Sequence, residues 1–376
     1  MIKPLDYHKM QSRLFKKAKR KIFPINAMFE ITYKCNLKCR HCYVVPTAIN
    51  EHRESRIEHR NELNAKEIFY ILDQLTEAGC LNLGFTGGEP FLRKDIFDIL
   101  RYAKNKGFNI IVLTNGTLIT PEKADRLKEL GLNKIDISFH TTNKETFDWF
   151  TKTPGTYRRA LRAVKLLRDR GIEVYLKATA MTINKDDILK IRHLGVEKFG
   201  AHFRYGPEVT PAWDGRKGNL KFRLSAKQNN QVKKAIQEDT EIEFEKLGTL
   251  EKKKRRSKKR ERPRGKIEHN RLFRCGAGRT DVVISPYGQM RLCMDIPFPK
   301  YQILRGSFAR GWKILNDYVK NTPPGPSYQC RDCKLTKYCN FCPARGWLEC
   351  GDMSACPPYY RKMARLARKK EIENAG

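Results

Sequence analysis

The chain has 376 residues, of which 40% are hydrophobic, and 76 Lys and Arg against 41 Asp and Glu give it a net charge of +35. That length is ample for a sizeable core and for two or three domains. No apolar run approaches the roughly 18 residues of a membrane-spanning helix, and residues 1–20 lack the apolar core of a signal peptide. The sequence therefore excludes a transmembrane helix and predicts a cytoplasmic protein.

The positive charge predicts a negatively charged partner, which could be nucleic acid, an anionic membrane surface or an acidic protein or peptide. Part of the charge lies in one block at residues 252–260, and such blocks are usually solvated. The block contains no aromatic residues that could stack on bases, which argues against nucleic acid. A lysine-rich surface is also typical of proteins that work at high temperature.

The first predicted strand, residues 27–33, alternates apolar side chains and leads directly to Cys35, Cys39 and Cys42. Three thiolates at this spacing converge on one centre only if the loop wraps around it, and thiolates favour iron–sulfur clusters, zinc or cuprous ions. Three protein ligands leave one metal position open, as in catalytic metal sites. Two alternatives remain: a structural zinc site with His41 as its fourth ligand, and a disulfide with a spare thiol.

Strands and helices alternate after a polar segment at residues 50–60. Asn64 should cap a helix that ends near residue 78, and strand 81–86 leads into Gly87-Gly88-Glu89-Pro90. The pattern then predicts helices at residues 94–106, 121–130, 156–170 and 185–194, and strands at residues 109–113, 134–139, 173–179 and 198–205.

Six strand–helix units imply right-handed crossovers and a parallel sheet. They are too few for a closed eight-fold barrel, so the predicted fold class is α/β, a partial (β/α)6 parallel barrel followed by a small cysteine-rich domain. The site should lie at the carboxyl ends of the strands. The cysteine loop, Gly87 to Pro90, Asn115 and Ser138 all fall there.

We expect four regions along the chain: a basic N-terminal segment at residues 1–26, a core at 27–207, a bridge at 208–274 and a cysteine-rich domain at 275–376. The bridge should hold a helix near residues 224–244 and the basic block, and the chain should end in a basic helix at residues 358–371. Twelve cysteines in a cytosolic chain favour metal ligands over disulfides. Cys80 stands apart, and we expect a buried structural thiol there.

The C-x3-C-x2-C loop, followed after the second strand by Gly-Gly-Glu-Pro, resembles the signature of the radical S-adenosylmethionine (radical SAM) enzymes. The resemblance implies a [4Fe–4S] cluster on Cys35, Cys39 and Cys42, whose open iron is chelated by the amino and carboxylate groups of S-adenosylmethionine. Reduction of the cluster would cleave the sulfonium to a 5′-deoxyadenosyl radical that abstracts a substrate hydrogen. The cofactor carries out the difficult chemistry, and the protein positions the reactants and shields the radical.

The same resemblance implies the residues that bind S-adenosylmethionine. The segment Gly87, Gly88, Glu89 and Pro90 would hold the methionine amino group, with glycines that let the backbone approach a ligand closely. Ser138 would contact the nucleoside or the carboxylate, and Asn115 lies at a neighbouring strand end. Arg159 or Arg158 would pair with the carboxylate. His41 and His140 are expected to have no role in proton transfer, and His41 should pack near the cluster.

A second set of cysteines resembles the SPASM domain, which carries auxiliary [4Fe–4S] clusters. The resemblance assigns Cys275, Cys293 and Cys342 to a first cluster, with Cys350 as a further ligand or with one iron left open. It assigns four others to a second cluster: Cys330, Cys333, Cys339 and Cys356. The spacing departs from the family, which has three residues rather than two before the fourth cysteine of the central run. A zinc ribbon is the competing interpretation.

Enzymes of this type mostly modify ribosomally made peptides or proteins, so the resemblance implies a peptide or protein substrate, for which an acidic leader would suit the +35 charge. It also implies a low-potential electron donor such as flavodoxin or ferredoxin. Only 26 residues precede the first strand, so leader recognition would need the basic surface or a separate protein. Asp295 is a candidate general base. The alternatives are a small-molecule enzyme such as a haem-precursor decarboxylase, and a zinc-bearing nucleic-acid-binding protein.

Overall fold

The computed structural model describes residues 7–44, 61–132, 134–206, 208–213, 215–246, 271–339 and 341–373. The polar segment expected at residues 50–60 and the basic block at residues 252–260 lie outside the described residues. None of the helices in the described ranges is both long and apolar enough to cross a membrane.

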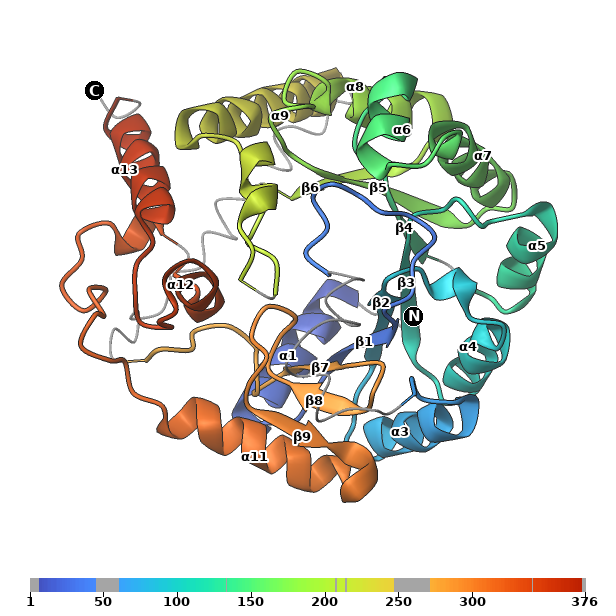
Figure 1. Ribbon diagram of the computed structural model, residues 1–376, viewed down its shortest axis with the longest axis horizontal. Helices are drawn as coiled ribbons and strands as arrows, with labels where there is room; N and C mark the ends of the chain where they lie inside the picture. Colours follow the sequence, from blue (N-terminus) through green and yellow to red (C-terminus); the bar gives the residue numbers. More distant parts are fainter. Residues whose placement is uncertain are drawn as a thin grey trace, which may run out of the picture.

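Six parallel strands form the centre of the molecule, and neighbours in sequence are neighbours in the sheet. They are β1 (Asn26–Thr32), β2 (Asn82–Gly87), β3 (Asn109–Thr114), β4 (Lys134–Ser138), β5 (Glu173–Thr179) and β6 (His202–Gly206). Figure 1 shows the curved sheet with helices along its outer side. The predicted parallel α/β fold is confirmed.

The outer helices are α3 (Ala65–Glu77), α4 (Ile96–Asn105), α5 (Pro121–Glu129), α7 (Thr156–Asp169) and α8 (Ile188–His193). The expected cap of α3 is present: the Asn64 side chain accepts from the Glu67 backbone N–H, and the Glu67 side chain accepts from that of Asn64. Among the helices of the parallel-strand region, α6 (Lys144–Thr151) was not predicted; it begins at the Asn143 cap. Its eight residues are too few for a clear helical pattern.

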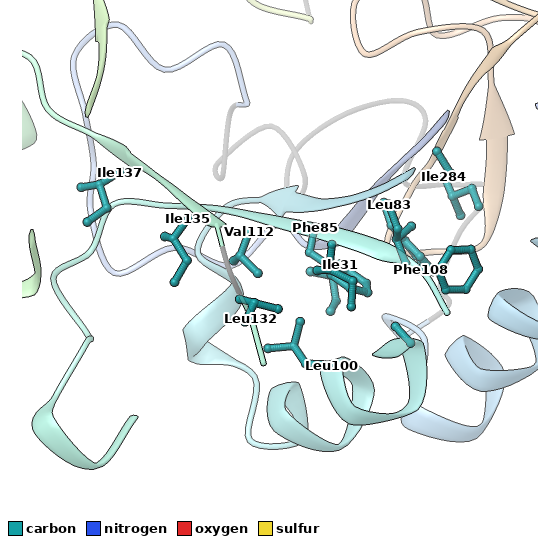
Figure 2. Close-up of a cluster of buried hydrophobic side chains, with 14 of the residues drawn as sticks. Ile31, Leu83, Phe85, Leu100, Phe108, Val112, Leu132, Ile135, Ile137 and Ile284 are labelled. Atoms are coloured by element: carbon teal, nitrogen blue, oxygen red, sulfur yellow. The ribbon is translucent and has the colours of Figure 1, made fainter. Parts of the chain in front are cut away.

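The core lies between the sheet and these helices. Alternate strand residues point outward and are buried against helix side chains such as Leu100, as Figure 2 shows; they include Ile31, Leu83, Phe85, Val112, Ile135 and Ile137. Each such side chain contributes roughly 1.5–3 kcal/mol when fully buried. The other strand residues therefore face the interior of the curve, which is free to carry polar chemistry.

The cysteine-rich region does not begin as a separate layer. Its strand β7 (Asp281–Ile284) pairs in parallel with β1, and β8 (Gln289–Arg291) and β9 (Lys300–Gln302) follow antiparallel, so the sheet has nine strands in the described residues. These strands have three or four residues each, too short for a recognisable alternation. The first part of the region predicted as a domain thus extends the sheet of the core.

The remaining elements surround this sheet. They are α1 (Tyr7–Lys21), η2 (Pro90–Leu92), the π-helical η3 (Leu194–Lys198), η4 (Gly218–Phe222), α9 (Ala226–Lys246), η5 (Ile303–Arg305), α11 (Phe308–Asn321), η6 (Thr336–Tyr338), α12 (Pro343–Cys350) and α13 (Pro358–Glu373). The predicted helices of the bridge and the C-terminus correspond to α9 and α13. Helices α1, α11 and α12, outside the parallel-strand region, were not predicted. Helices α12 and α13 lie together at one side of the molecule (Figure 1).

Candidate functional site

The cysteine loop follows β1 at its carboxyl end. Burial raises the pKa of Cys39, and the neighbouring Cys42 and Cys35 raise it further. Burial and Cys35 likewise raise the pKa of Cys42 to about 11. Cys35 Sγ accepts from the Leu37 backbone N–H at 3.4 Å. The three thiols therefore share one partly buried volume, in which they would be held as thiolates only by positive charge such as that of a metal.

A cluster and a single metal ion require different arrangements of the thiols. Four thiolates around one zinc ion would lie about 3.8 Å apart, given bonds of about 2.3 Å at tetrahedral angles. Among the described residues, no three Cys, His, Asp or Glu side chains come together in a way that could hold one metal ion. A cluster takes each thiolate on a different iron, so it requires a wider spacing of the thiols than one zinc ion does.

The second motif packs against the start of this loop. Gly88 N–H donates to the Thr32 carbonyl oxygen at 2.7 Å, and Glu89 N–H donates to that of Lys34 at 2.9 Å. A Cβ atom on Gly87 would lie 2.1 Å from the Thr32 oxygen, and one on Gly88 would lie 2.2 Å from the Lys34 oxygen. The glycines are thus required for the contact between two backbone segments, whereas the sequence suggested an approach to a ligand.

Glu89 is completely buried and connects β2 to β3. One carboxylate oxygen accepts from Thr114 Oγ1 at 2.7 Å and from Phe91 N–H at 3.1 Å, and the other accepts from Asn115 N–H at 2.8 Å. Burial raises the pKa of Glu89, and these hydrogen bonds oppose the rise. The carboxylate is fully engaged by the protein, so its role in the structure is to fix Pro90, Asn115 and the strand ends.

Asn115 extends this network to the cysteine loop. Its Nδ2 donates to Asn36 Oδ1 at 2.9 Å and lies 3.9 Å from Cys35 Sγ. Asn36 Nδ2 donates to Thr117 Oγ1, which donates in turn to Asn115 Oδ1 at 2.6 Å. The structure therefore brings together the predicted residues at the ends of β1, β2 and β3.

The predicted residues farther along the sheet are arranged differently. Ser138 is half-buried at the end of β4, where it pairs with Lys177 of β5. Arg158 and Arg159 are exposed on α7, and Arg159 donates to the Pro154 carbonyl oxygen at 3.3 Å. No described contact joins either arginine to the cysteine loop, so their role as carboxylate ligands stays a prediction. His41 packs between the rings of Phe150 and His140, as the sequence suggested for it.

Charged side chains that the sequence analysis did not single out line the inner face of β4 to β6. Asp136 is buried, and its pKa is raised by burial and lowered by Arg204, Lys177 and Lys134. The Arg204 guanidinium lies 4.0 Å above the ring of Tyr175. The signal for these residues was present in the sequence, because the polar positions of each strand recur with a period of two.

A second missed cluster joins β1 to β8. Arg291 donates to the Glu30 carboxylate and, at 3.0 Å, to Tyr33 Oη, and Tyr33 Oη donates to Glu30 at 2.9 Å. Burial raises the pKa of Glu30, whereas Arg291 lowers it. The Trp213 ring lies 5.1 Å from the Arg291 guanidinium and 5.5 Å from the ring of Tyr43, which directly follows Cys42. We call Glu30, Tyr33, Tyr43, Trp213 and Arg291 the inner polar cluster.

The inner polar cluster also reaches the predicted base. Asp295 is largely buried, and its pKa is raised by burial and lowered by Arg345 and Arg291. Cys293 in turn acts electrostatically on Arg291. The cluster therefore lies between the cysteine loop and the segment that holds Cys293 and Asp295.

The eight C-terminal cysteines fall into two groups by the electrostatic coupling of their thiols. Cys342 is coupled to Cys293 and to Cys275. The second group is coupled internally and consists of Cys330, Cys333, Cys339 and Cys356. Cys350 is exposed, and it acts electrostatically on Cys356. Cys80 is buried, as expected.

Residues 29–195 match the model of the Radical SAM superfamily. This part of the chain is a radical SAM domain. The domain thus spans β1 to α8, including the cysteine loop and the glutamate network. When bound, the cluster and S-adenosylmethionine supply a hydrogen-abstracting radical, and the roles of the individual residues in holding them stay predictions.

The chain is similar to proteins with haem-related names and to one with a bacteriocin-related name. It is 37% identical over 186 residues to the Fe-coproporphyrin III synthase of Methanosarcina barkeri, covering 50% of this chain and 43% of that protein, less than half its length. It is 28% identical over 338 residues to the antilisterial bacteriocin subtilosin biosynthesis protein AlbA of Bacillus subtilis, covering 86% of this chain and 68% of that protein. It is 25% identical over 357 residues to the AdoMet-dependent heme synthase of M. barkeri, covering 88% of this chain and 94% of that protein.

The fold is similar to that of Streptococcus suis SuiB bound to S-adenosylmethionine, with a TM-score of 0.69 and 17% sequence identity over 94% of this chain and 82% of that one. At that identity the similarity shows the fold alone. It extends beyond the radical SAM domain into the cysteine-rich region.

Replacing Gly88 with alanine should separate the second motif from the cysteine loop, because the new Cβ would lie 2.2 Å from the Lys34 oxygen. We expect the free energy of unfolding to fall by roughly 1–3 kcal/mol and the iron bound per chain to fall with it. Urea denaturation and iron analysis measure both. Gly218→Ala is the matched control, because its Cβ would meet no atom within 4 Å. Normal stability and iron content in Gly88→Ala would contradict the packing role.

Replacing Arg291 with methionine should make stability strongly dependent on pH. Burial already holds the pKa of Glu30 above its ordinary 4.5, and removing Arg291 raises it further. The folded state then retains a proton that the unfolded state has lost, so the free energy of unfolding falls as pH rises above about 4.5. At pH 8 we expect a loss of about 3–5 kcal/mol in denaturant unfolding.

The double variant Glu30→Gln/Arg291→Met is the control for this prediction, because it lacks the group that titrates. Its stability should change little between pH 5 and pH 8. An Arg291→Met protein that is equally stable at both pH values would show that the pair is not the buried unit described here.

Proposed function

We propose that this radical SAM enzyme modifies a ribosomally made peptide or protein. The observation that carries the proposal is the set of buried polar atoms in the inner polar cluster that have no hydrogen-bond partner among the described residues. They are one acceptor, Glu30 Oε1, and two donors, Trp213 Nε1 and Arg291 Nε. A buried polar atom without a partner costs about 1–3 kcal/mol, so a bound molecule that supplies partners is favoured.

A peptide group has the matching chemistry. Its carbonyl oxygen can accept from the donors of Trp213 and Arg291, and its N–H can donate to Glu30. An ionised propionate offers only acceptors, and Glu30 would repel it when ionised. The similarity to AlbA over 86% of this chain, and the fold shared with SuiB, of which a complex with the precursor peptide SuiA exists, support the same substrate class.

A haem-precursor enzyme is the second candidate, because two of the three relatives named above carry haem-related names. Lys177 and Arg204 on the inner face could pair with the carboxylates of such a substrate. Arg204 already lies 3.4 Å from the Asp136 carboxylate, however, and this contact offsets part of its charge. The inner polar cluster therefore favours the amide substrate.

We also propose the roles of the site residues. Cys35, Cys39 and Cys42 would hold the catalytic cluster, and the two C-terminal groups would hold auxiliary clusters. We propose that Cys350 either completes the first group or leaves it with three thiolate ligands and one open iron. Asp295 would accept a proton from the substrate, beside the first group. The twelve free cysteines suit a reducing compartment, which supports a cytoplasmic location.

Protein purified without oxygen is expected to carry about twelve irons, four for each cysteine group, and the Cys35→Ala/Cys39→Ala/Cys42→Ala variant about eight. The loss of four follows because only the loop group is removed. Iron and sulfide analysis measures it, and Cys80→Ala, which removes a buried thiol outside the groups, is the control. Zinc in place of iron would contradict the cluster assignment.

The substrate is tested with dithionite, S-adenosylmethionine and two probes: a short peptide encoded beside the gene, and iron coproporphyrin III. We expect the peptide to lose hydrogen or gain a crosslink, detected by tandem mass spectrometry, and the porphyrin to remain unchanged. Glu30→Gln should reduce peptide modification at least tenfold, because one hydrogen-bond partner becomes mismatched. Release of carbon dioxide from the porphyrin, with an unmodified peptide, would overturn the proposal in favour of the second candidate.

A further inference from the structure

The second C-terminal cysteine group lies close to the surface. Cys330, Cys333, Cys339 and Cys356 line a small pocket together with Arg274 and Arg361. Cys330 is buried, and the other three are partly exposed. Arg361 lies close enough to Cys356 to lower the pKa of that thiol. In the first group, Cys275 is exposed, and Cys293 is half-buried beside the inner polar cluster.

Basic side chains are frequent on the segments that carry that pocket. The two chain segments that carry it, residues 330–339 and 357–369, contain eight Lys and Arg against a single acid, Asp332. All eight are exposed. We call them the basic rim; they are Arg331, Lys334, Lys337, Arg361, Lys362, Arg365, Arg368 and Lys369. Helix α13, which supplies five of them, packs against η6 and α9 and so holds the rim on a defined scaffold.

We propose that the basic rim is the docking surface for a small acidic protein that carries single electrons. The inference rests on the proposed function in one respect, because it takes the second cysteine group to hold an iron–sulfur cluster. A redox group near the surface exchanges electrons only with a partner that binds over it. A charged surface around the pocket suits a partner that binds transiently. Complementary charge accelerates association, and it does not require a large apolar interface.

Two other features of the molecule suit this partner less well. Helix α1 is also basic, but no described contact joins it to a cysteine group, so a carrier bound there would have no redox group beneath it. Nucleic acid would need exposed aromatic side chains to stack on. The tyrosines of α13 are already engaged, because Tyr359 stacks on Arg223 and Tyr360 on Arg345.

The test compares two charge reversals of equal size in the full, iron-loaded protein. The rim variant is Lys334→Glu/Lys362→Glu/Arg365→Glu, and the matched control on α1 is Lys16→Glu/Lys17→Glu/Arg20→Glu. All six side chains are exposed. The probe is a purified acidic bacterial flavodoxin, and the readout is its dissociation constant by calorimetry at several salt concentrations. Iron content and thermal unfolding establish that both variants are folded and loaded.

We expect the rim variant to bind flavodoxin at least about tenfold more weakly at low salt and with a smaller salt dependence. The α1 variant should stay within about twofold of the original protein. Equal weakening in both variants would show general attraction to net charge, and no weakening in either would place the carrier elsewhere. Each of these results overturns the proposal.

Single-stranded RNA, titrated in the same way, tests the other class of partner. If the rim variant loses affinity for RNA but keeps its affinity for flavodoxin, the rim is a nucleic-acid surface and the proposal fails. Dithionite bypasses the carrier, so substrate modification with dithionite should be unchanged in the rim variant. A protein that binds flavodoxin through the rim but modifies no peptide would contradict the proposed function and leave the docking surface intact.

Discussion

The close approach of two backbone segments, Thr32 to Lys34 and Gly87 to Glu89, is the constraint on which the site depends. The hydrogen bonds of 2.7 and 2.9 Å between them are possible only because neither glycine has a Cβ. Glu89 then extends the contact to β3 with a buried carboxylate. Burying that carboxylate is unfavourable by itself, and three hydrogen bonds offset the cost. One short segment thus fixes the ends of three strands and, through Asn115, the cysteine loop.

The Glu30–Arg291 pair connects this arrangement to the cysteine-rich region. Buried ion pairs contribute little net stability, because desolvation of both charges opposes their attraction. Their geometry is nevertheless specific, and this pair ties β1 to β8 two residues before Cys293. Together with the parallel pairing of β1 and β7, it makes the C-terminal segment an extension of the barrel. The inner polar cluster therefore owes its position between two cysteine groups to the sheet itself.

Local patterns in the sequence predicted the six parallel strands, their outer helices and the Asn64 cap, because each depends on neighbours within a few residues. Strand β7 and the Glu30–Arg291 pair could not be predicted in this way, since their partners in β1 lie more than 250 residues away. Strands β8 and β9 are too short for a recognisable alternation. Arg159 was selected for its place at a helix start; it is exposed on the first turn of α7, and its role stays a prediction. Lys177 and Arg204 stand on the inner face by strand alternation, and that signal was overlooked.

The net charge of +35 suggested an acidic substrate, but the cations inside the molecule and those on its surface differ in how far nearby carboxylates offset them. Several inner cations face carboxylates: Arg291 pairs with Glu30, Arg204 with Asp136, and Arg345 with Glu208 at 2.7 Å. A compensated cation orients a neutral polar group well but attracts an anion weakly. The basic rim has eight cations against one acid in its two segments, so its field extends into solvent. The charge therefore favours an amide substrate inside the barrel and an acidic partner at the surface.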